Sequence, residues 1–327
     1  MSLSKRERIE KTLAGEPVDR VAVALWRHWP GDDQRPADFV RAVVDFQRQY
    51  DWDFIKFTPT SSFCIADYGV QDRWVGSLEG TREYTRRAVQ RPEDWAALKV
   101  LDPQEGKLGR ELEALRMLKA AIGDEVPILQ TVFNPLAQAK NIAGPDLMIK
   151  HMRTHPEAFH AGLKTIAEST LRYMEALHTI GIDGIFYAVQ HASYTLLTDD
   201  EYRLFGKAYD RQILGALTSN WWFNMLHLHG DAPMFDLFLD YPLEAINWHD
   251  RETEPTLAQG LAKFKGAACS GLGRWDPVHN GTPDEVRAQA RDAIDQADGR
   301  RLILSTGCVM MITSPTSNLR AVREAVE

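Results

Sequence analysis

The feature that most constrains this chain is an alternation of short apolar runs with longer amphipathic stretches, which continues along most of its 327 residues. The apolar runs have the length of strands rather than of helices. We expect eight strands, at residues 21–26, 54–58, 126–133, 184–189, 224–229, 245–248, 267–272 and 302–306. Strands that alternate with helices are typical of parallel βα units, and eight such units predict a (β/α)8 barrel, the TIM barrel.

The stretches between the strands have the spacing of helices. We expect helices at residues 37–50, 107–122, 156–180, 199–220, 255–264, 283–297 and 316–326, in addition to an N-terminal helix before the first strand. Two of them have clear start signals, because Thr198 with Glu201 and Thr282 with Glu285 have the spacing of capping boxes.

A doubly wound open sheet is the competing fold. No G-x-G-x-x-G follows the first strand, which removes the usual support for that alternative. The run from Cys64 to Lys107 fits neither a simple helix nor a strand, and its segment "YGVQDRWVGSLEGTREY" predicts a hairpin-bearing excursion after the second strand. Since neither a repeat nor an interdomain linker is evident, we expect residues 1–327 to form a single barrel domain.

Charge and composition exclude some classes of partner. The net charge is −8, from 38 basic and 46 acidic residues, and Lys and Arg form no block, which disfavours nucleic acid and anionic membrane surfaces. No apolar run reaches the length of a membrane span and the start "MSLSKRERIEK" is polar, so we expect a cytoplasmic protein. Three scattered cysteines, Cys64, Cys269 and Cys308, do not form a disulfide framework and indicate reduced thiols.

Two histidines in "NMLHLHGD", residues 224–231, are one residue apart in an apolar stretch. In a strand His227 and His229 point to the same face. Adjacent imidazoles repel one another when protonated and are unfavourable to desolvate when neutral, so a metal or a shared anionic partner usually compensates them. The alternative is that both are neutral core residues that are satisfied by hydrogen bonds.

Other polar and aromatic residues occur where the strands end, which is where a (β/α)8 barrel builds its active site. We expect Arg27 to anchor an anionic group of the substrate, and Lys56 either to bind an anion, to act as a base or to point outward. The further candidates for contact with the substrate are Trp26, Trp29, Gln190, His191, Asn247 and Trp248, of which the tryptophans have the core as their alternative location. Arg274 and Asp276 are expected to pair with each other.

Cys308 follows Gly307 at the end of the eighth strand, from which it can reach across the barrel mouth toward the histidine pair. By default such a cysteine is a small buried hydrophobe. With His227 and His229, however, it makes a set of two imidazoles and one thiolate. That set would leave one position of a zinc ion open, as in catalytic rather than structural zinc sites.

Four segments resemble the uroporphyrinogen decarboxylase superfamily: "SKRERIEKTLAGEPVDRVAV", "HLHG", "GLGRWDPVHNGTPDEV" and "LILSTGCVMMITSPTSNLRAVREAV". The resemblance covers essentially the whole chain and implies a (β/α)8 barrel. One branch of this superfamily decarboxylates porphyrinogens without a cofactor, and the other comprises cobalamin-dependent methyltransferases that activate a thiol on zinc. The methyltransferases use an H-x-C pair on the fifth strand and a cysteine in a "GC" after the eighth. His227 and Cys308 match this pattern, whereas His229 stands where the first cysteine would be and makes the site less anionic.

The decarboxylase branch matches less well. Arg27 corresponds to the first arginine of its "MRQAGR" type of motif, but the second arginine is absent from "WRHWPG". The acidic residues expected on strands two and four are replaced in "FIKFT" and "YAVQHAS". The chain therefore lacks both the cations that a tetrapyrrole polycarboxylate needs and the acid that protonates it.

The sequence thus predicts a zinc-dependent methyltransferase, with His227, His229 and Cys308 as metal ligands and catalytic residues. It would activate a small thiol or related acceptor for methyl transfer from a corrinoid or another methylated donor. One alternative is a cofactor-free decarboxylase of a smaller acid, with Arg27 on the carboxylate, and a second is a non-catalytic corrinoid-binding protein. The resemblance is compatible with a corrinoid-carrying partner protein and with a homodimer.

Overall fold

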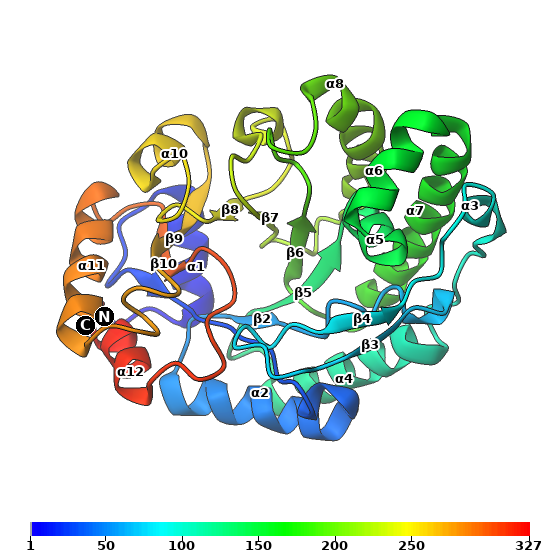
Figure 1. Cartoon of the computed structure of the whole chain (residues 1–327). Helices are drawn as coiled ribbons and strands as arrows, with labels where there is room; N and C mark the ends of the chain where they lie inside the picture. The colour runs from blue at the N-terminus through cyan, green and yellow to red at the C-terminus, as the bar shows by residue number, and fades with distance from the viewer. Residues whose placement is uncertain (1) are drawn as a thin grey trace.

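The computed structural model describes residues 2–327, so Met1 of the expected domain lies outside the described residues. In this range a curled sheet of eight parallel strands has the order β1-β10-β9-β8-β7-β6-β5-β2 (Figure 1). The strands are β1 (Ala22–Val23), β2 (Ile55–Phe57), β5 (Ile128–Phe133), β6 (Gly184–Val189), β7 (Met225–Leu228), β8 (Ala245–Trp248), β9 (Ala267–Leu272) and β10 (Leu302–Thr306). Each lies within one predicted strand, and the barrel class is confirmed.

The first and second strands close the ring without forming a ladder. The Asp53 amide donates to the Val23 carbonyl over 2.9 Å, and the Val23 amide donates to Asp53 Oδ2 over 2.8 Å. Where β1 meets β2, the Asp53 carboxylate therefore takes the place of one backbone carbonyl as hydrogen-bond acceptor. The two strands are also the shortest of the sheet, with two and three residues.

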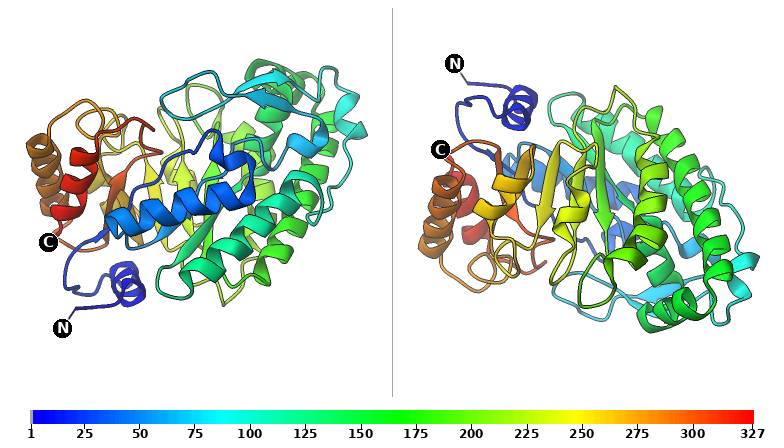
Figure 2. Two further views of the ribbon diagram at one scale, coloured as in Figure 1. Left: turned by 90° about the horizontal axis from the view of Figure 1, so that it is seen from below. Right: turned by 90° about the horizontal axis from the view of Figure 1, so that it is seen from above.

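Helices surround the sheet in the three views (Figures 1 and 2). Those that match predicted helices are α1 (Lys5–Ala14), α2 (Pro36–Tyr50), α4 (Gly106–Ile122), α7 (Pro156–His178), α10 (Leu257–Lys263), α11 (Pro283–Gln296) and α12 (Thr316–Glu324). Both predicted capping boxes are present. Short 3-10 turns are η1 (Asp32–Gln34), η2 (Ala66–Tyr68) and η4 (Phe235–Phe238).

Two helical regions differ from expectation. The predicted helix 199–220 is divided into α8 (Asp199–Tyr202), a π-helical turn η3 (Arg203–Lys207) and α9 (Ala208–Leu214), and it ends early at Gly215. Helices α5 (Pro135–Ala143) and α6 (Pro145–Thr154) were not predicted. Eight of the nine residues of α5 are buried, so it lacks the one-sided apolar pattern by which a surface helix is recognised.

The expected excursion after β2 is confirmed. It contains the antiparallel hairpin of β3 (Gln71–Arg73) and β4 (Glu83–Arg86), followed by the short helix α3 (Asp94–Ala97). The Ile312 amide donates to the Leu78 carbonyl over 2.7 Å and ties the hairpin loop to the segment after β10. Since β10 lies on the other side of β1 from β2, this bond draws the loop across the open end of the barrel.

Aromatic side chains pack inside the ring. Trp26 meets Phe186 edge-on at 5.5 Å between ring centroids, and Phe54 meets Phe223 at 5.1 Å. These contacts fill the interior, so that polar side chains are accommodated toward the carboxyl ends of the strands.

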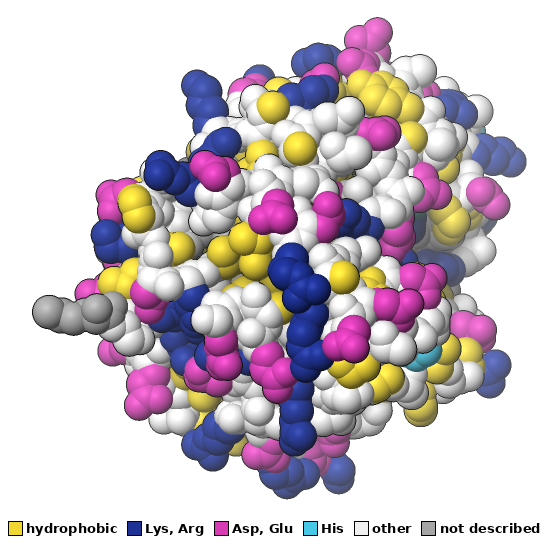
Figure 3. Space-filling model, turned by 90° about the vertical axis from the view of Figure 1, so that its left-hand side faces the viewer, with side chains coloured by type: hydrophobic (Ala, Val, Ile, Leu, Met, Phe, Trp, Pro, Cys, Tyr) yellow, Lys and Arg dark blue, Asp and Glu magenta, His cyan; other side chains and the backbone are white. Residues whose placement is uncertain are grey.

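The described surface carries charges of both signs. Acidic and basic side chains lie next to one another on the face that includes α11 and α12 (Figure 3). Between residues 2 and 327, none of the helices is both long and apolar enough to cross a membrane.

Candidate functional site

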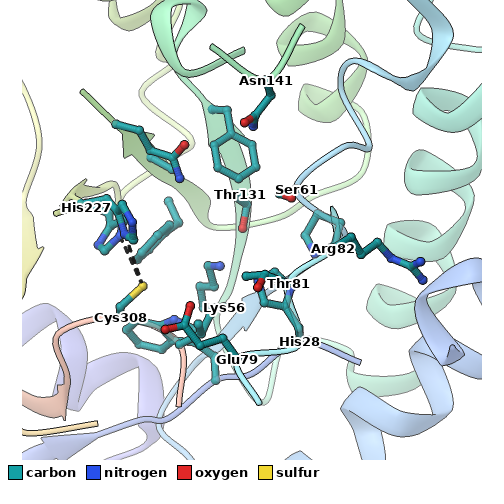
Figure 4. Close-up of a pocket in the computed structure, with 18 of the residues that line it drawn as sticks. His28, Lys56, Ser61, Glu79, Thr81, Arg82, Thr131, Asn141, His227 and Cys308 are labelled. Atoms are coloured by element: carbon teal, nitrogen blue, oxygen red, sulfur yellow. Dashed lines mark hydrogen bonds between the residues drawn. The ribbon is translucent and has the colours of Figure 1, made fainter. Parts of the chain in front are cut away.

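Three histidines and one cysteine converge at the carboxyl ends of β7, β8 and β10. His227, His229, His249 and Cys308 each offer one ligand atom, and these four atoms lie within 4.8 Å of one another. Cys308 Sγ is 3.7 Å from His227 Nε2, the two residues labelled beside the dashed lines of Figure 4, and 3.7 Å from His229 Nδ1. His249 Nε2 is 3.4 Å from His229 Nδ1.

The strand register explains this convergence. His227 and His229 point to one side because they are two residues apart along β7 and its continuation. Gly307 brings the cysteine near, since a Cβ at this position would lie 2.5 Å from the Trp248 carbonyl oxygen and 2.7 Å from His249 Cα. Only a glycine lets the end of β10 approach the end of β8 so closely, and Cys308 follows directly.

Hydrogen bonds orient two of the imidazoles. His227 Nδ1 lies 2.6 Å from Asn247 Oδ1, while the Asn247 amide nitrogen donates to the carbonyls of Cys269 and Thr306. The Asn247 oxygen is therefore an acceptor, so His227 Nδ1 carries a proton and Nε2 faces Cys308. His249 Nδ1 bonds Glu252 Oε2 over 3.0 Å, which likewise leaves its Nε2 facing the cluster.

The electrostatics of the cluster favour a thiolate. Burial alone would raise the pKa of Cys308, but His227 and hydrogen bonds from the imidazoles hold it well below its usual range. Burial lowers the pKa of His227. Burial also opposes protonation of His249, yet hydrogen bonds with Cys308 and Glu252 raise its pKa to about 9. The cluster thus combines an anionic sulfur with a requirement for positive charge, which either a protonated His249 or a metal ion can supply.

The cluster borders a cavity of about 230 Å³ at the carboxyl end of the barrel (Figure 4). The wall is formed by the ends of the strands, the hairpin loop and α5. It is lined by Trp26, His28, Lys56, Pro59, Ser61, Glu79, Thr81, Arg82, Tyr84, Thr131, Phe133, Lys140, Asn141, Phe186, Ala188, Gln190, His227, His229, Cys308 and Val309.

Two lysines, Lys56 and Lys140, belong to this wall. Burial lowers the pKa of Lys56 to about 7, against the attraction of the Cys308 thiolate, and the Lys56 ammonium lies 4.6 Å above the Phe186 ring. Burial, with repulsion from Arg87, lowers the pKa of Lys140 to about 8. Among residues 2–327, no carboxylate forms an ion pair with either lysine.

Arg82 differs from these lysines. Its guanidinium points away from the other labelled side chains in Figure 4 and contacts Asp33 at 3.3 Å and Asp72 at 3.6 Å. The acid on the wall is Glu79, which accepts from Arg274 Nη1 over 3.0 Å.

Some predicted site residues lie around this cavity and others do not. Trp26, Lys56 and Gln190 line it together with His227, His229 and Cys308, whereas Arg27, Trp29, His191, Asn247 and Trp248 do not. Trp248 is buried and donates through Nε1 to the Pro255 carbonyl, so it is a core residue. Asn247 forms a hydrogen bond with His227 and orients its ring. Arg274 pairs with Glu79 and Glu252, and its expected pairing with Asp276 is wrong.

Arg27, the expected anchor for an anionic group of the substrate, does not line this cavity. Its guanidinium lies 4.1 Å over the Trp29 ring and donates to the Ile312 carbonyl over 2.7 Å, outside the cavity. Successive side chains of an extended segment point in alternate directions. Because Trp26 points into the cavity, Arg27 points away from it. The cations that face the cavity are Lys56 and Lys140 instead.

Sequence reasoning missed His249, Glu79, Lys140 and His28. His249 directly follows the sixth expected strand, so the rule that selected its neighbours Asn247 and Trp248 could also have selected it. Glu79 and Lys140 come from the hairpin loop and from α5, for which no local pattern predicts a position at the barrel mouth.

Comparison with known proteins adds the family. The family model described as Uroporphyrinogen decarboxylase (URO-D) matches residues 34–327. This chain belongs to the uroporphyrinogen decarboxylase family. The sequence-based assignment to that family is therefore confirmed.

Relatives indicate the branch of the uroporphyrinogen decarboxylase family. The methylcobamide:CoM methyltransferase MtbA of Methanosarcina acetivorans is 24% identical over 344 positions, which cover 98% of this chain and 97% of MtbA. The methylated-thiol–coenzyme M methyltransferase of Methanosarcina mazei is 26% identical over 240 positions, with 72% and 62% covered. These relatives confirm the predicted methyltransferase class.

A solved structure supports the fold. A methyltransferase from Methanosarcina mazei superposes with a TM-score of 0.86 at 19% identity, and the match covers 99% of this chain and 98% of that protein. This chain therefore has the same fold as that solved structure.

Proposed function

We propose that this chain is a zinc-dependent methyltransferase that passes a methyl group from a corrinoid, or another methylated donor, to a small thiol or related acceptor. The observation that carries the proposal is the convergence of His227, His229 and Cys308 at one wall of a cavity. The methyltransferase relatives supply the type of reaction.

The donor set fits zinc. Neutral imidazole nitrogens and a thiolate are ligands that zinc prefers, and a hydrogen bond on the second nitrogen of His227 is the usual support for a metal-ligating histidine. His227 through Nε2, His229 through Nδ1 and Cys308 through Sγ would hold the ion. Bound there, zinc would supply Lewis acidity that favours the thiolate form of an acceptor thiol.

The cavity restricts the acceptor. A volume of about 230 Å³ is below the range of roughly 300–1,000 Å³ typical of drug-sized ligands, which favours a small acceptor. Lys56 and Lys140 would neutralise an anionic group on it, and Trp26 and Phe186 would form the apolar wall. A bulky corrinoid would then remain at the barrel mouth, presented by a partner protein, while the acceptor is held inside.

The test combines metal content with turnover. Protein purified without a nickel column and reconstituted should hold one zinc per chain, transfer methyl groups from methylcobalamin to a small thiol, and release a proton when the thiol is added. His227→Ala should lose both metal and turnover. His28→Gln removes another imidazole of the cavity wall and should keep its zinc.

Two outcomes would contradict the proposal. Far less than one zinc per chain after reconstitution, or full metal in His227→Ala, would exclude the proposed metal site. Release of carbon dioxide from a small acid without metal would support the decarboxylase alternative instead.

A further inference from the structure

We infer that the acceptor is a zwitterionic thiol, whose ammonium group binds Glu79 and whose anionic group binds Lys56. This inference rests on the function proposed above and narrows its substrate class from small thiols in general to thiols of the amino-acid type. The observation that carries it is that charges of both signs line one cavity without forming ion pairs with each other.

Glu79 supplies the negative charge of the cavity wall. Of the described residues that line the cavity, Glu79 alone carries a carboxylate, whereas Lys56 and Lys140 are cations of the same wall. Glu79 forms its ion pair with Arg274, and no ion pair joins it to either lysine in the part of the chain that the structure describes. Opposite charges that face a cavity separately are complementary to a ligand that carries both charges.

One oxygen of Glu79 remains available to such a ligand. A carboxylate offers about four acceptor positions, two on each oxygen. Oε1 accepts from Arg274 Nη1 over 3.0 Å, and within residues 2–327 no donor bonds Oε2. The Glu79 side chain is 29% exposed and borders the cavity. An ammonium group in the cavity would therefore find a charged acceptor that is already oriented by Arg274.

Hydrogen bonds hold Glu79 on the same side as the metal-binding cluster. Arg274 Nε donates to Glu252 Oε1 over 3.1 Å, and Glu252 Oε2 bonds Nδ1 of His249 over 3.0 Å. His249 belongs to the cluster with Cys308. Through this chain of contacts Arg274 positions Glu79 close to the place where the acceptor sulfur would bind.

Gly80 allows the hairpin loop to bring Glu79 to the cavity. It has φ +75°, and a Cβ at this position would lie 2.6 Å from the His28 Cβ and 3.0 Å from Ile312 Cγ2. Both the backbone conformation and the close approach therefore require glycine. His28 itself lines the cavity, so the loop lies directly against its wall.

The cluster, Glu79 and Lys56 lie close enough for one small molecule to reach all three. Cys308, Glu79 and Lys56 lie toward one end of the cavity in Figure 4, and Asn141 lies at the other. Attraction by the Cys308 thiolate raises the pKa of Arg274, the partner of Glu79, and opposes the effect of burial on the pKa of Lys56. A thiol, an ammonium and an anionic group on one short chain match these three anchors. Because three different anchors distinguish mirror images, the cavity should prefer one enantiomer.

The experiment measures dissociation constants by titration calorimetry on the full-length chain after reconstitution with zinc. The probes are cysteine and homocysteine, their deamino analogues mercaptopropionate and mercaptobutyrate, and their decarboxylated analogues cysteamine and homocysteamine. At least one of the two amino acids should bind roughly 10–100-fold more tightly than either of its analogues, because each analogue lacks one charge-assisted contact. The two enantiomers of that amino acid should differ in affinity.

Variants assign each contact to its residue. Glu79→Gln keeps the size of the side chain and an oxygen for Arg274, so it should weaken the amino acid and its decarboxylated analogue roughly 10–100-fold and leave the deamino analogue unchanged. Lys56→Met should weaken the amino acid and the deamino analogue instead. Glu83→Gln is the matched control, because Glu83 is an exposed carboxylate of the same hairpin that does not line the cavity. It should bind every probe as the wild type does.

The inference and the proposed function fail in different ways. Equal affinity of both amino acids and their deamino analogues in the wild type would overturn the inference, even if zinc binds and methyl transfer proceeds. Equal weakening of all probes in Glu79→Gln would also overturn it, because Glu79 would then only shape the loop. Preference for the ammonium group in a protein that binds no zinc would refute the metal-dependent function and support the inferred ligand class.

Discussion

Two buried charged residues lie close together in and just before strand β2, and they differ in how they are paired. Asp53 precedes the strand and accepts four hydrogen bonds, from Arg8 Nη1 (2.7 Å), from both terminal nitrogens of Arg20 (2.7 and 2.9 Å) and from the Val23 amide (2.8 Å). Lys56, the middle residue of β2, has its ammonium over the Phe186 ring and forms no ion pair with a carboxylate among residues 2–327.

The contrast separates the two ends of the barrel. At the amino end the charges are paired with one another, so this end closes the ring and stabilises the fold. At the carboxyl end the thiolate, the imidazoles and the lysines are held in place but are incompletely paired, which leaves them available to ligands. This is the division between a stabilising face and a functional face that is typical of (β/α)8 barrels.

Substitution of Asp53 should have the largest effect. Asp53→Asn leaves the buried guanidinium of Arg8 and the adjacent Arg20 without their shared anion, and we expect the free energy of unfolding to fall by about 3–5 kcal/mol. Urea denaturation measures this change. Asp51→Asn is the matched control, because Asp51 is exposed and its ion pairs contribute about 1 kcal/mol or less. Equal losses in the two variants would contradict the distinction between the buried, paired Asp53 and the exposed Asp51.

Cys308→Ser should have the next largest effect, and on function rather than on folding. Zinc affinity should fall by more than about 100-fold, with methyl transfer in parallel, while the unfolding free energy of the zinc-depleted protein should change less than in Cys269→Ser, because Cys308 borders the cavity. Chelator competition and turnover measure the first two quantities. Cys269→Ser is the control, since Cys269 is also buried but lies outside the cluster, so it should lose stability and keep zinc. A shared phenotype would argue against a special role for Cys308.

Lys56→Met should weaken acceptor binding at the carboxyl end. Loss of one charge-assisted contact contributes about 1.5–3 kcal/mol, so the KM for an anionic thiol should rise roughly 10–100-fold. A neutral thiol of similar size serves as the control and should show little change. A KM that rises equally for both thiols would mean that Lys56 shapes the cavity rather than binds charge.

The same substitution should stabilise the fold in a pH-dependent way. Because burial lowers the pKa of Lys56 to about 7, the unfolded chain binds more protons than the folded one between about pH 7 and the ordinary lysine pKa of 10.5. The unfavourable effect of Lys56 is therefore complete below pH 7 and is relieved as the pH rises. Lys56→Met should raise the unfolding free energy by about 1–3 kcal/mol at pH 6.5 and by less at pH 9.5, as chemical denaturation can determine. A gain that grows with pH would refute this explanation.

Arg27→Met should have the smallest effect. Arg27 lies outside the cavity, so the KM should be unchanged, and loss of its hydrogen bond to the Ile312 carbonyl should reduce stability by about 0.5–1.5 kcal/mol. Steady-state kinetics of Arg27→Met and Lys56→Met, measured with the same anionic thiol, compare the two KM values directly. A KM that rises more in Arg27→Met than in Lys56→Met would restore the anchor that the sequence suggests.

Local patterns were sufficient for most of the fold. The strand at 245–248 and the capping box at Thr282 depend on residues that are close in sequence, and both have the expected bounds or contacts. The helix α5 could not be recognised in this way, because its burial on most sides removes the amphipathic period. The bounds of β1 could not be predicted from the local pattern either. The apolar run at 21–26 is longer than the part that pairs with a neighbouring strand, Ala22–Val23.

The sequence by itself determined the barrel class, the family and the common face of His227 and His229, because strand period and motif spacing are properties of neighbouring residues. Only the tertiary structure decided that His249 joins the cluster, that Lys56 rather than Arg27 faces the cavity, and that Glu79 reaches Arg274 across 195 residues. The physical reason is that each of these contacts depends on how the ring closes and on how a loop crosses its mouth. Such contacts are set by packing between distant segments, and no local pattern encodes them.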